Sequence, residues 1–217
     1  MDPVHECIPL IGNVFYSDIE VHHKQPVRQA SEGSSLRNLN IYTELEKSGT
    51  KFTPRQQYYF ARELKDHGKW KKAAKYFKKF LNSRKGWIED NIASCYNLAI
   101  CYNALGENEK ILPTLLKSFE YDTPRAEACS EIGYYYKRAE NWVMALKWFD
   151  LAASLKKSDS IGFVLWDYWG YIPNIEACVC CCHLGNFEQA KKFNERAATY
   201  KPNSAAIEIN RKYLETK

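Results

Sequence analysis

Four segments of the sequence align without a gap on one recurring pattern of small residues and glycines. They read FARELKDHGKWKKAAKYF, LAICYNALGENEKILPTL, IGYYYKRAENWVMALKWF and ACVCCCHLGNFEQAKKFN. A small residue recurs at Ala61, Ala99, Gly133 and Cys178; seven positions later come Gly68, Gly106, Glu140 and Gly185; twelve positions after the first come Ala73, Ile111, Ala145 and Ala190. An internal repeat of this kind constrains the fold more than any single motif does.

The pattern predicts stacked helical hairpins. Two helices cross closely only where side chains are small, and a glycine ends the first helix by adopting a left-handed conformation. Apolar or aromatic residues lie one turn after the small position, at Leu64, Tyr102, Tyr136 and Cys181, and others follow the turn, at Trp70, Trp142 and Phe187. We expect these residues to fill the space inside each hairpin.

This pattern resembles the tetratricopeptide repeat over residues 54–202. Ala73 with Phe77 and Ala145 with Phe149 reproduce the A-x-x-x-F element of that family, and Pro202 lies where a repeat closes. The departures are Ile111 at a small position, Glu140 in place of the turn glycine, and Asn194 in place of an aromatic. The resemblance implies an all-α fold, a right-handed superhelix of about four hairpins.

The array carries an insertion and a predicted cap. The last interval between small positions is longer than the others because of SDSIGFVLWDYWG, residues 158–170, which either extends a helix, forms an aromatic flap or adds a packing layer through Trp166 and Trp169. Residues 203–217 predict a terminal helix with Asn203 as N-cap and apolar Ile207, Ile209 and Leu214. An open array needs such a helix to cover its last apolar face.

The first fifty residues do not fit the repeat. Residues 1–33 combine β-branched and aromatic residues with a turn-like Gly12-Asn13, which predicts one or two short strands and a loop. Residues 34–50 predict a linker helix with Ser35 as N-cap and Gly49 as stop.

A second resemblance covers the N-terminal part. PVHECI, SDIEVHHK and the run from LRNLNIYTELEKSG into the first repeat resemble the end of a family 2 glycosyltransferase catalytic domain that continues into a tetratricopeptide tail. The resemblance places that family's acceptor-side H-E pair on His5 and Glu6. It places a histidine close to the metal and nucleotide diphosphate on His23.

The catalytic half of that family, with its D-x-D metal motif, has no counterpart in these 217 residues. A histidine without the acidic pair and the phosphate-binding half cannot orient a sugar nucleotide. We therefore expect no cofactor and no transfer activity for this chain alone. The alternative is a piece of a glycosyltransferase, completed by an upstream or separate domain that brings a divalent metal and a nucleotide-sugar.

The resemblance to tetratricopeptide repeats implies a binding scaffold whose concave groove is lined by the first helix of each hairpin. The expected groove residues are Tyr58, Arg62, Lys65, Tyr96, Asn103, Tyr134, Lys137 and Arg138. Aromatic and cationic side chains favour a protein, peptide or glycan partner through stacking and charge-assisted hydrogen bonds. An unused, solvated groove is the alternative.

The segment from Lys69 to Lys85 has eight basic residues and no acidic one. Its apolar residues fall on one helical face, so it reads first as the second helix of a hairpin with a solvated outer face. Attraction to an anionic membrane or polymer, and hence a peripheral membrane contact, is the alternative. We expect no nucleic-acid partner, because the stacking aromatics of an RNA-binding sheet are missing.

Eight cysteines are present, four of them in CVCCC at residues 178–182. Their distribution lacks the spread of a secreted disulfide framework and indicates a reducing cytoplasm. On a helix, Cys180 points away from Cys178, Cys181 and Cys182, so one metal cannot collect all four. We expect Cys178 and Cys181 to pack against the helix of Ala190 and Cys182 to lie nearer the groove, with metal or redox chemistry as the lesser alternative.

Overall fold

The computed structural model describes residue 4 and residues 32–156 and 164–217. Within these ranges the chain is helical and has no strand, which confirms the all-α fold class. The strands expected in residues 1–33 lie outside the described residues, apart from residue 4 and the last two positions. Those two positions belong to a helix that begins at Glu32.

Four helical hairpins follow the first helix, α1 (Glu32–Lys47). The first hairpin pairs α2 (Pro54–Asp66) with α3 (Trp70–Ser83). In the second, α4 (Ile88–Ala104) pairs with an arm of three short pieces, η1 (Asn108–Lys110), α5 (Ile111–Leu116) and η2 (Lys117–Glu120). The third pairs α6 (Ala126–Arg138) with α7 (Trp142–Ser154). After η3 (Trp166–Trp169), the fourth pairs α8 (Tyr171–His183) with α9 (Phe187–Tyr200), and α10 (Ala205–Glu215) closes the array.

The hairpin turns have the predicted left-handed residues. Gly68, Gly106 and Gly185 have φ angles of 69°, 72° and 74°. Glu140, which replaces the glycine in the third hairpin, adopts the same conformation with φ 55°. The repeat therefore keeps its turn geometry even where the residue disfavours it.

The small positions are the crossing points of the helices. Ala61, Ala99 and Cys178 are buried, as are their partners on the second helices. At Gly133 an added Cβ would lie 2.8 Å from the ring of Phe149. The third hairpin thus crosses so closely that only a hydrogen fits.

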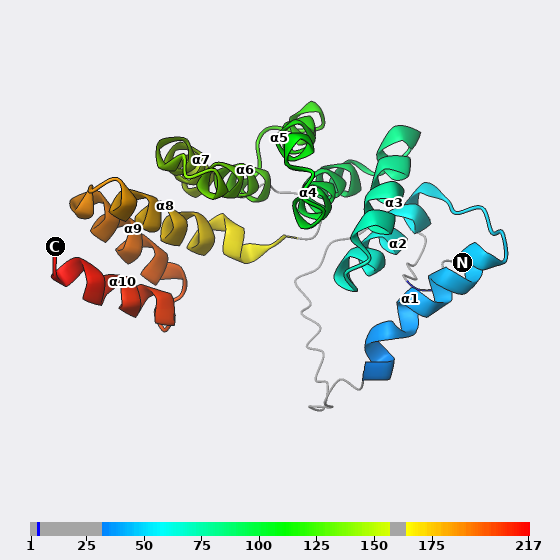
Figure 1. The fold of residues 1–217 in the computed structure, drawn as a ribbon, viewed down its shortest axis with the longest axis horizontal. Coiled ribbons are helices and arrows are strands. Elements are labelled where there is room, and N and C mark those ends of the chain that lie inside the picture. The colour runs from blue at the N-terminus through cyan, green and yellow to red at the C-terminus, as the bar shows by residue number, and fades with distance from the viewer. Residues whose placement is uncertain (1–3, 5–31, 157–163) are drawn as a thin grey trace, which may run out of the picture.

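The hairpins form an arch (Figure 1), in which α4 and α6 lie on the inner side and α5 and α7 on the outer side. The first helices of neighbouring hairpins also contact one another, α2 with α4, α4 with α6 and α6 with α8. These helices therefore make a continuous inner layer. The arrangement is the superhelix that the repeat predicted.

The second hairpin is less regular than its sequence pattern suggested. Its second arm contains only one α-helical piece, α5, between two 3-10 turns. Ile111 occupies the crossing position and is buried, and Pro113 cannot donate a backbone hydrogen bond. The proline ring would clash with the carbonyl four residues earlier in a regular helix, so the α-helix cannot extend back through η1 and begins only at Ile111.

Both predicted caps need correction. Helix α1 begins at Glu32, so Ser35 lies within its first turn rather than at its N-cap. In α10 the N-cap is Ser204 and not Asn203. Ile207 and Leu214 are buried as expected, whereas Ile209 is exposed, so only part of the predicted apolar stripe covers the fourth hairpin.

None of the helices in the described ranges is long and apolar enough to span a bilayer.

Candidate functional site

The inner layer has a polar surface where the first helices of neighbouring hairpins meet. Several of its side chains lie in one helix and interact with the next. We call this surface the inner face, and it comprises Arg62, Lys65, Tyr96, Asn97, Glu127, Glu131, Tyr134, Lys137 and Glu176. Five of the eight residues expected in a groove belong to it.

Tyr58 is not one of them. Its side chain is only 3% exposed, and its ring centroid lies 6.5 Å from that of Phe77 and 5.5 Å from that of Phe80. Burial also raises the pKa of its hydroxyl. The prediction that Tyr58 faces a groove is therefore wrong, because the ring fills the core between α2 and α3.

Several inner-face residues link neighbouring hairpins. The Lys65 ammonium donates to the Asn97 side-chain oxygen over 2.8 Å, joining α2 to α4. Glu176 on α8 accepts from the Tyr134 hydroxyl at 3.2 Å and from the Lys137 ammonium at 2.5 Å, joining α6 to α8. Lys65, Tyr134 and Lys137 thus connect neighbouring hairpins as well as lining the inner face.

At the N-terminal end of the inner face, two arginines lie close to a buried carboxylate. The Arg62 guanidinium is 5.7 Å from the centroid of the Tyr58 ring and 5.9 Å from that of Tyr59. Burial raises the pKa of Asp90 to about 6, and the positive charges of Arg55 and Arg62 partly oppose that rise. This end therefore combines cations, aromatic rings and an acid whose pKa is raised by burial.

The remaining predicted residues lie at the ends of the first helices. Asn103 in the last turn of α4 and Arg138 at the end of α6 are exposed, and neither makes a side-chain hydrogen bond or ion pair with another described residue. Tyr96 is half-buried, and burial raises the pKa of its hydroxyl. These three residues offer hydrogen-bonding and charged groups to a ligand.

The insertion packs against the first helix of the third hairpin. Within its described part, the Tyr168 hydroxyl donates to Glu131 at 2.8 Å, and the Trp169 indole N–H donates to Glu127 at 2.7 Å. Burial raises the pKa of Glu131. The expected packing role holds for Trp169, which is half-buried, whereas Trp166 is 66% exposed.

Glu127 and Glu131 were missed by sequence reasoning. A signal was present, since both carboxylates lie four residues apart on the first helix of the third hairpin, in the spacing that puts two side chains on one face. The sequence does not indicate that residues about 40 positions downstream supply their hydrogen-bond donors, because that depends on how the insertion returns.

The cysteines of the fourth hairpin belong to the core. Cys178, Cys180 and Cys181 are buried and pack with Ala190 and Phe193, and Cys182 is half-buried. Burial raises the pKa of Cys178 and Cys180 to about 12. Thiols with such pKa values are inert at neutral pH, and the described residues contain no cluster of three or more metal-ligating side chains.

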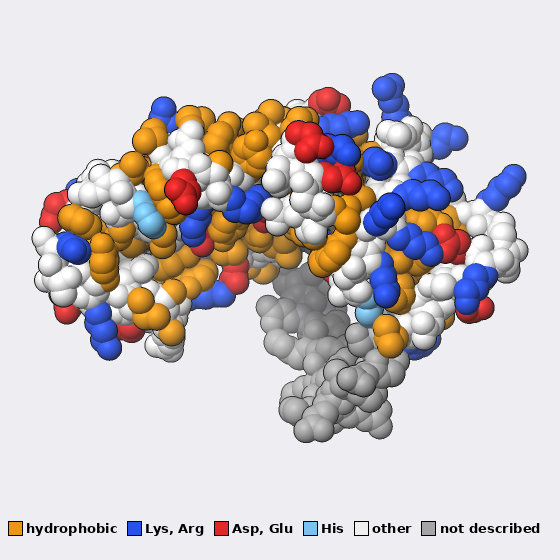
Figure 2. Space-filling model, viewed as in Figure 1, with side chains coloured by type: hydrophobic (Ala, Val, Ile, Leu, Met, Phe, Trp, Pro, Cys, Tyr) orange, Lys and Arg blue, Asp and Glu red, His pale blue; other side chains and the backbone are white. Residues whose placement is uncertain are grey.

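The basic run forms α3 as expected. Its apolar residues, Ala73, Ala74, Phe77, Phe80 and Leu81, are buried. Figure 2 shows the Lys and Arg side chains gathered over this part of the molecule. The outer face of α3 is therefore a strongly cationic surface.

His5, Glu6 and His23 lie outside the described residues. Their expected roles in acceptor and metal binding stay predictions.

Comparisons with known proteins agree with this architecture. No protein-family model matches the sequence, and no curated protein matches it. Among solved structures, the chain is similar to TTC0263, a thermophilic TPR protein of Thermus thermophilus, at 14% identity over 85% of this chain and 92% of that one, with a TM-score of 0.60. MamA of Desulfovibrio magneticus gives 15% identity, 80% and 89% coverage and a TM-score of 0.59.

YrrB, described as a TPR protein with an unusual peptide-binding site, gives 18% identity over 83% of this chain and 84% of that one, with a TM-score of 0.57. Identities this low establish the fold and not the ligand. The chain has the tetratricopeptide-repeat fold.

Proposed function

We propose that this chain is a non-catalytic interaction module that binds an extended segment of a partner protein along its inner face. The fold supports the proposal, since arrays of helical hairpins create long curved surfaces suited to extended ligands. The peptide-binding site named for YrrB, which shares the fold, is consistent with it.

The observation that carries the proposal is the way the inner face holds η3. A short segment distant in sequence lies against α6 and is held by side-chain hydrogen bonds from Tyr168 and Trp169 to two glutamates. The surface therefore already accommodates a peptide segment of this chain. A partner would use the same kind of contact elsewhere along the face.

The partner's contact sites follow from which side chains are exposed. Asn103 and Arg138 lie at the ends of α4 and α6 with their polar groups open to solvent, and half-buried Tyr96 lies on the inner layer between α2 and α6. An arginine and an amide at this edge suit acidic and amide groups of a peptide. We infer that the partner contributes carboxylate or backbone carbonyl oxygens at these two positions.

A binding measurement on the full chain tests the proposal. A partner captured from an extract of the source organism is identified, purified and titrated against the chain and its variants. Arg138→Glu is expected to weaken binding by about tenfold, because it replaces attraction by repulsion. Lys147→Glu on the exposed face of α7 carries the same charge change and is expected to leave binding within about twofold. Equal effects of both variants would reject the edge of the inner face at Asn103 and Arg138 as part of the binding surface.

The finer expectation, a tetratricopeptide tail of a family 2 glycosyltransferase that binds a glycan acceptor, rests on the sequence resemblance alone. The comparisons with known proteins give it no support. It is tested by nucleotide-sugar hydrolysis or transfer with the isolated chain and a divalent metal. Robust turnover would contradict the non-catalytic module proposed here.

We also propose a cytoplasmic location. The seven described cysteines are free thiols, and burial raises the pKa of most of them. A chain with this many unpaired thiols is suited to a reducing compartment.

A further inference from the structure

An open pocket of about 550 Å³, which shares no lining residue with the inner face, lies where the first three helices meet the end of α4. It is bordered by α1, by the turn between α2 and α3, by the first residues of α3 and by the end of α4. Its lining residues are Leu39, Thr43, Leu64, Gly68, Lys69, Trp70, Lys71, Lys72 and Leu105.

The floor and walls of this pocket are apolar. Leu39 and Leu64 belong to the core and are nearly inaccessible to solvent, while Trp70 and Leu105 are partly buried and pack against the same core. Gly68 in the turn has no side chain to project into the space, and a Cβ there would meet only the Trp70 indole nitrogen at 3.9 Å. The pocket therefore has the size and the lining of a site for a large apolar group.

The rim of the pocket is cationic. Lys72 is paired with Glu46, which also accepts a hydrogen bond from the Tyr76 hydroxyl at 2.7 Å. The side chains of Lys69 and Lys71 are exposed and make no ion pair or hydrogen bond with any described residue. The acid at the end of α2, Asp66, is already paired with Lys65 at 3.1 Å. Two positive charges at the mouth of an apolar pocket thus lack a counter-charge from the described part of the chain.

Helix α3, which begins at the rim, adds further positive charge next to the pocket. Helix α3 contains no acidic residue, and its lysines continue along the exposed face from Lys71 through Lys75 and Lys78. An anionic partner would be attracted to this face over a Debye length of about 8 Å at physiological ionic strength. The pocket lies at one end of that cationic surface.

We propose that this pocket is a second docking site, independent of the inner face, for an acidic segment of a partner protein that inserts one large apolar side chain. The apolar side chain fills the space above Leu39 and Leu64, and flanking Asp or Glu residues pair with Lys69 and Lys71. A lipid surface fits less well, because a discrete pocket takes one inserted group whereas a bilayer would engage the whole face of α3.

Three synthetic peptides test the proposal by fluorescence anisotropy with the full chain. The first has one tryptophan flanked on each side by three glutamates. The second has alanine in place of the tryptophan, and the third has lysines in place of the glutamates. The first peptide is expected to bind at least about tenfold more tightly than either of the others, because only it satisfies both the pocket and the rim. Equal binding of the first two peptides would overturn the proposal, since the pocket would then contribute nothing.

Two pairs of variants locate the binding. Lys71→Glu is expected to weaken the first peptide about fivefold or more, whereas Lys78→Glu, two turns further along α3, carries the same charge change about a Debye length away and is expected to have a smaller effect. Thr43→Glu places a carboxylate in the pocket and is expected to abolish binding, whereas Asn40→Glu on the exposed face of α1 is the matched control.

Circular dichroism of each variant establishes that it is folded. Equal losses for Lys71→Glu and Lys78→Glu would overturn the proposal in favour of non-specific charge attraction. A second result would also overturn it: the chain binds phosphatidylserine vesicles, Lys71→Glu abolishes that binding, and the first peptide does not bind at all.

Discussion

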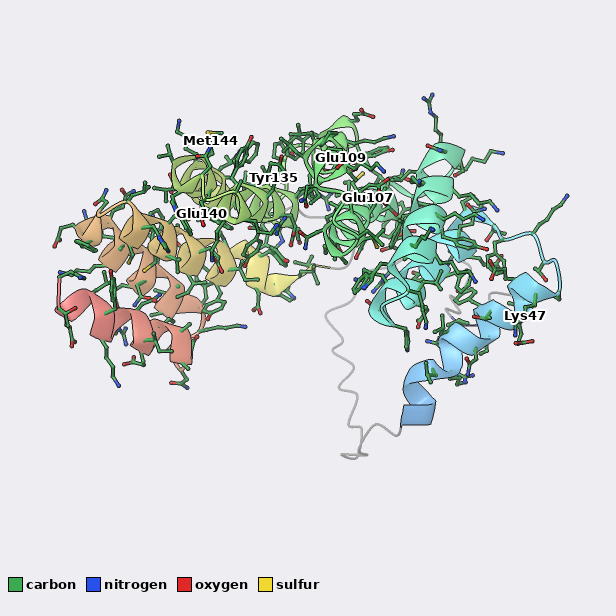
Figure 3. All side chains as sticks on the ribbon, viewed as in Figure 1. Lys47, Glu107, Glu109, Tyr135, Glu140 and Met144 are labelled. Atoms are coloured by element: carbon green, nitrogen blue, oxygen red, sulfur yellow. The ribbon has the colours of Figure 1, made fainter. Side chains whose placement is uncertain are left out.

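Glu140 is the residue at which the chain departs most clearly from its own repeat. It occupies the turn between α6 and α7, where Figure 3 labels it, with an exposed side chain and φ 55°. A left-handed conformation costs a residue with a Cβ roughly 1–2 kcal/mol, and glycine avoids most of that cost. The third hairpin is therefore less stable than it would be with a glycine at position 140.

We predict that Glu140→Gly raises the free energy of unfolding by about 0.5–1 kcal/mol. Urea denaturation followed by circular dichroism measures the change. Ala139→Gly is the control, because Ala139 has φ −84° and a glycine there only adds flexibility to the unfolded chain. Equal effects of the two variants would mean that the left-handed strain is absent.

Gly133 is a position where a glycine is present and a larger residue does not fit. Its Cα faces the ring of Phe149, and a Cβ would come within 2.8 Å of that ring. We predict that Gly133→Ala lowers the free energy of unfolding by about 1–3 kcal/mol through overpacking, although alanine favours helix. Adding Phe149→Leu, which makes room, is expected to recover part of the loss. A stabilised single variant would show that the helices can separate at no cost.

Asp90 gives the chain a pH dependence. Burial raises its folded-state pKa to about 6, against the opposing charges of Arg55 and Arg62. The unfolded chain loses this proton near pH 4, so between about pH 4 and 6 the folded state binds more protons and stability from this group falls as the pH rises. We predict that Asp90→Asn removes this fall, as measured by urea denaturation at several pH values. An unchanged pH profile would contradict the raised pKa.

At the scale of elements, one arginine joins the second hairpin to the third. Arg125, just before α6, donates two hydrogen bonds to Glu89 in the first turn of α4, at 2.5 and 2.9 Å, and two more to Asp122, at 2.8 and 3.3 Å. The side chains of Arg125 and Glu89 are only 13% and 14% exposed. The Arg125 hydrogen bond also lowers the pKa of Asp122. The Arg125–Glu89 pair thus connects the start of α6 to the start of α4, and the irregular second arm lies between these two helices in the sequence.

We predict that Arg125→Ala lowers the free energy of unfolding by about 3 kcal/mol, because it leaves a largely buried carboxylate without its partner. The matched control is Arg211→Ala, which removes a pair with Glu195 whose side chains are 37% and 57% exposed. That loss is expected to stay within about 1 kcal/mol. Similar losses in thermal or urea denaturation would show that burial does not decide the strength of these pairs.

The hairpins were predictable from sequence because their signals are local. A small residue at the crossing and a left-handed residue seven positions later locate the first helix and the turn of a hairpin, and Ala61 with Gly68 illustrates this. The irregular second arm was only partly predictable, since Ile111 departs from the pattern but does not by itself indicate that α5 stops at Leu116.

At the scale of the whole molecule, the candidate site was harder to predict, because the inner face is made between hairpins. The register placed Arg62, Tyr96 and Tyr134 correctly in the first helices. It did not show that Tyr58 turns into the core, or that Lys137 is engaged by Glu176 from the next hairpin. Which side chains remain available depends on the curvature of the array, and a single repeat does not encode that curvature.

The whole array presents two chemically distinct surfaces. The inner face and its N-terminal end mix arginines, tyrosines and buried carboxylates, whereas the outer face of α3 is uniformly cationic beside an apolar pocket. The residues that line the pocket are not those of the inner face, so a partner on one need not displace a partner on the other. The central claim is that the inner face is the primary binding surface.

Site-specific photo-crosslinking tests this claim most directly. A photoreactive phenylalanine analogue is placed in the full chain at Asn103 or Arg138 on the inner side, or at Lys78 or Lys147 on outer faces, and adducts formed in an extract of the source organism are identified by mass spectrometry. We predict that Asn103 and Arg138 give adducts with the same protein, through one continuous segment of it, and that Lys147 gives none. A protein that forms adducts from Lys78 or Lys147, with no adducts from Asn103 or Arg138, would contradict the claim.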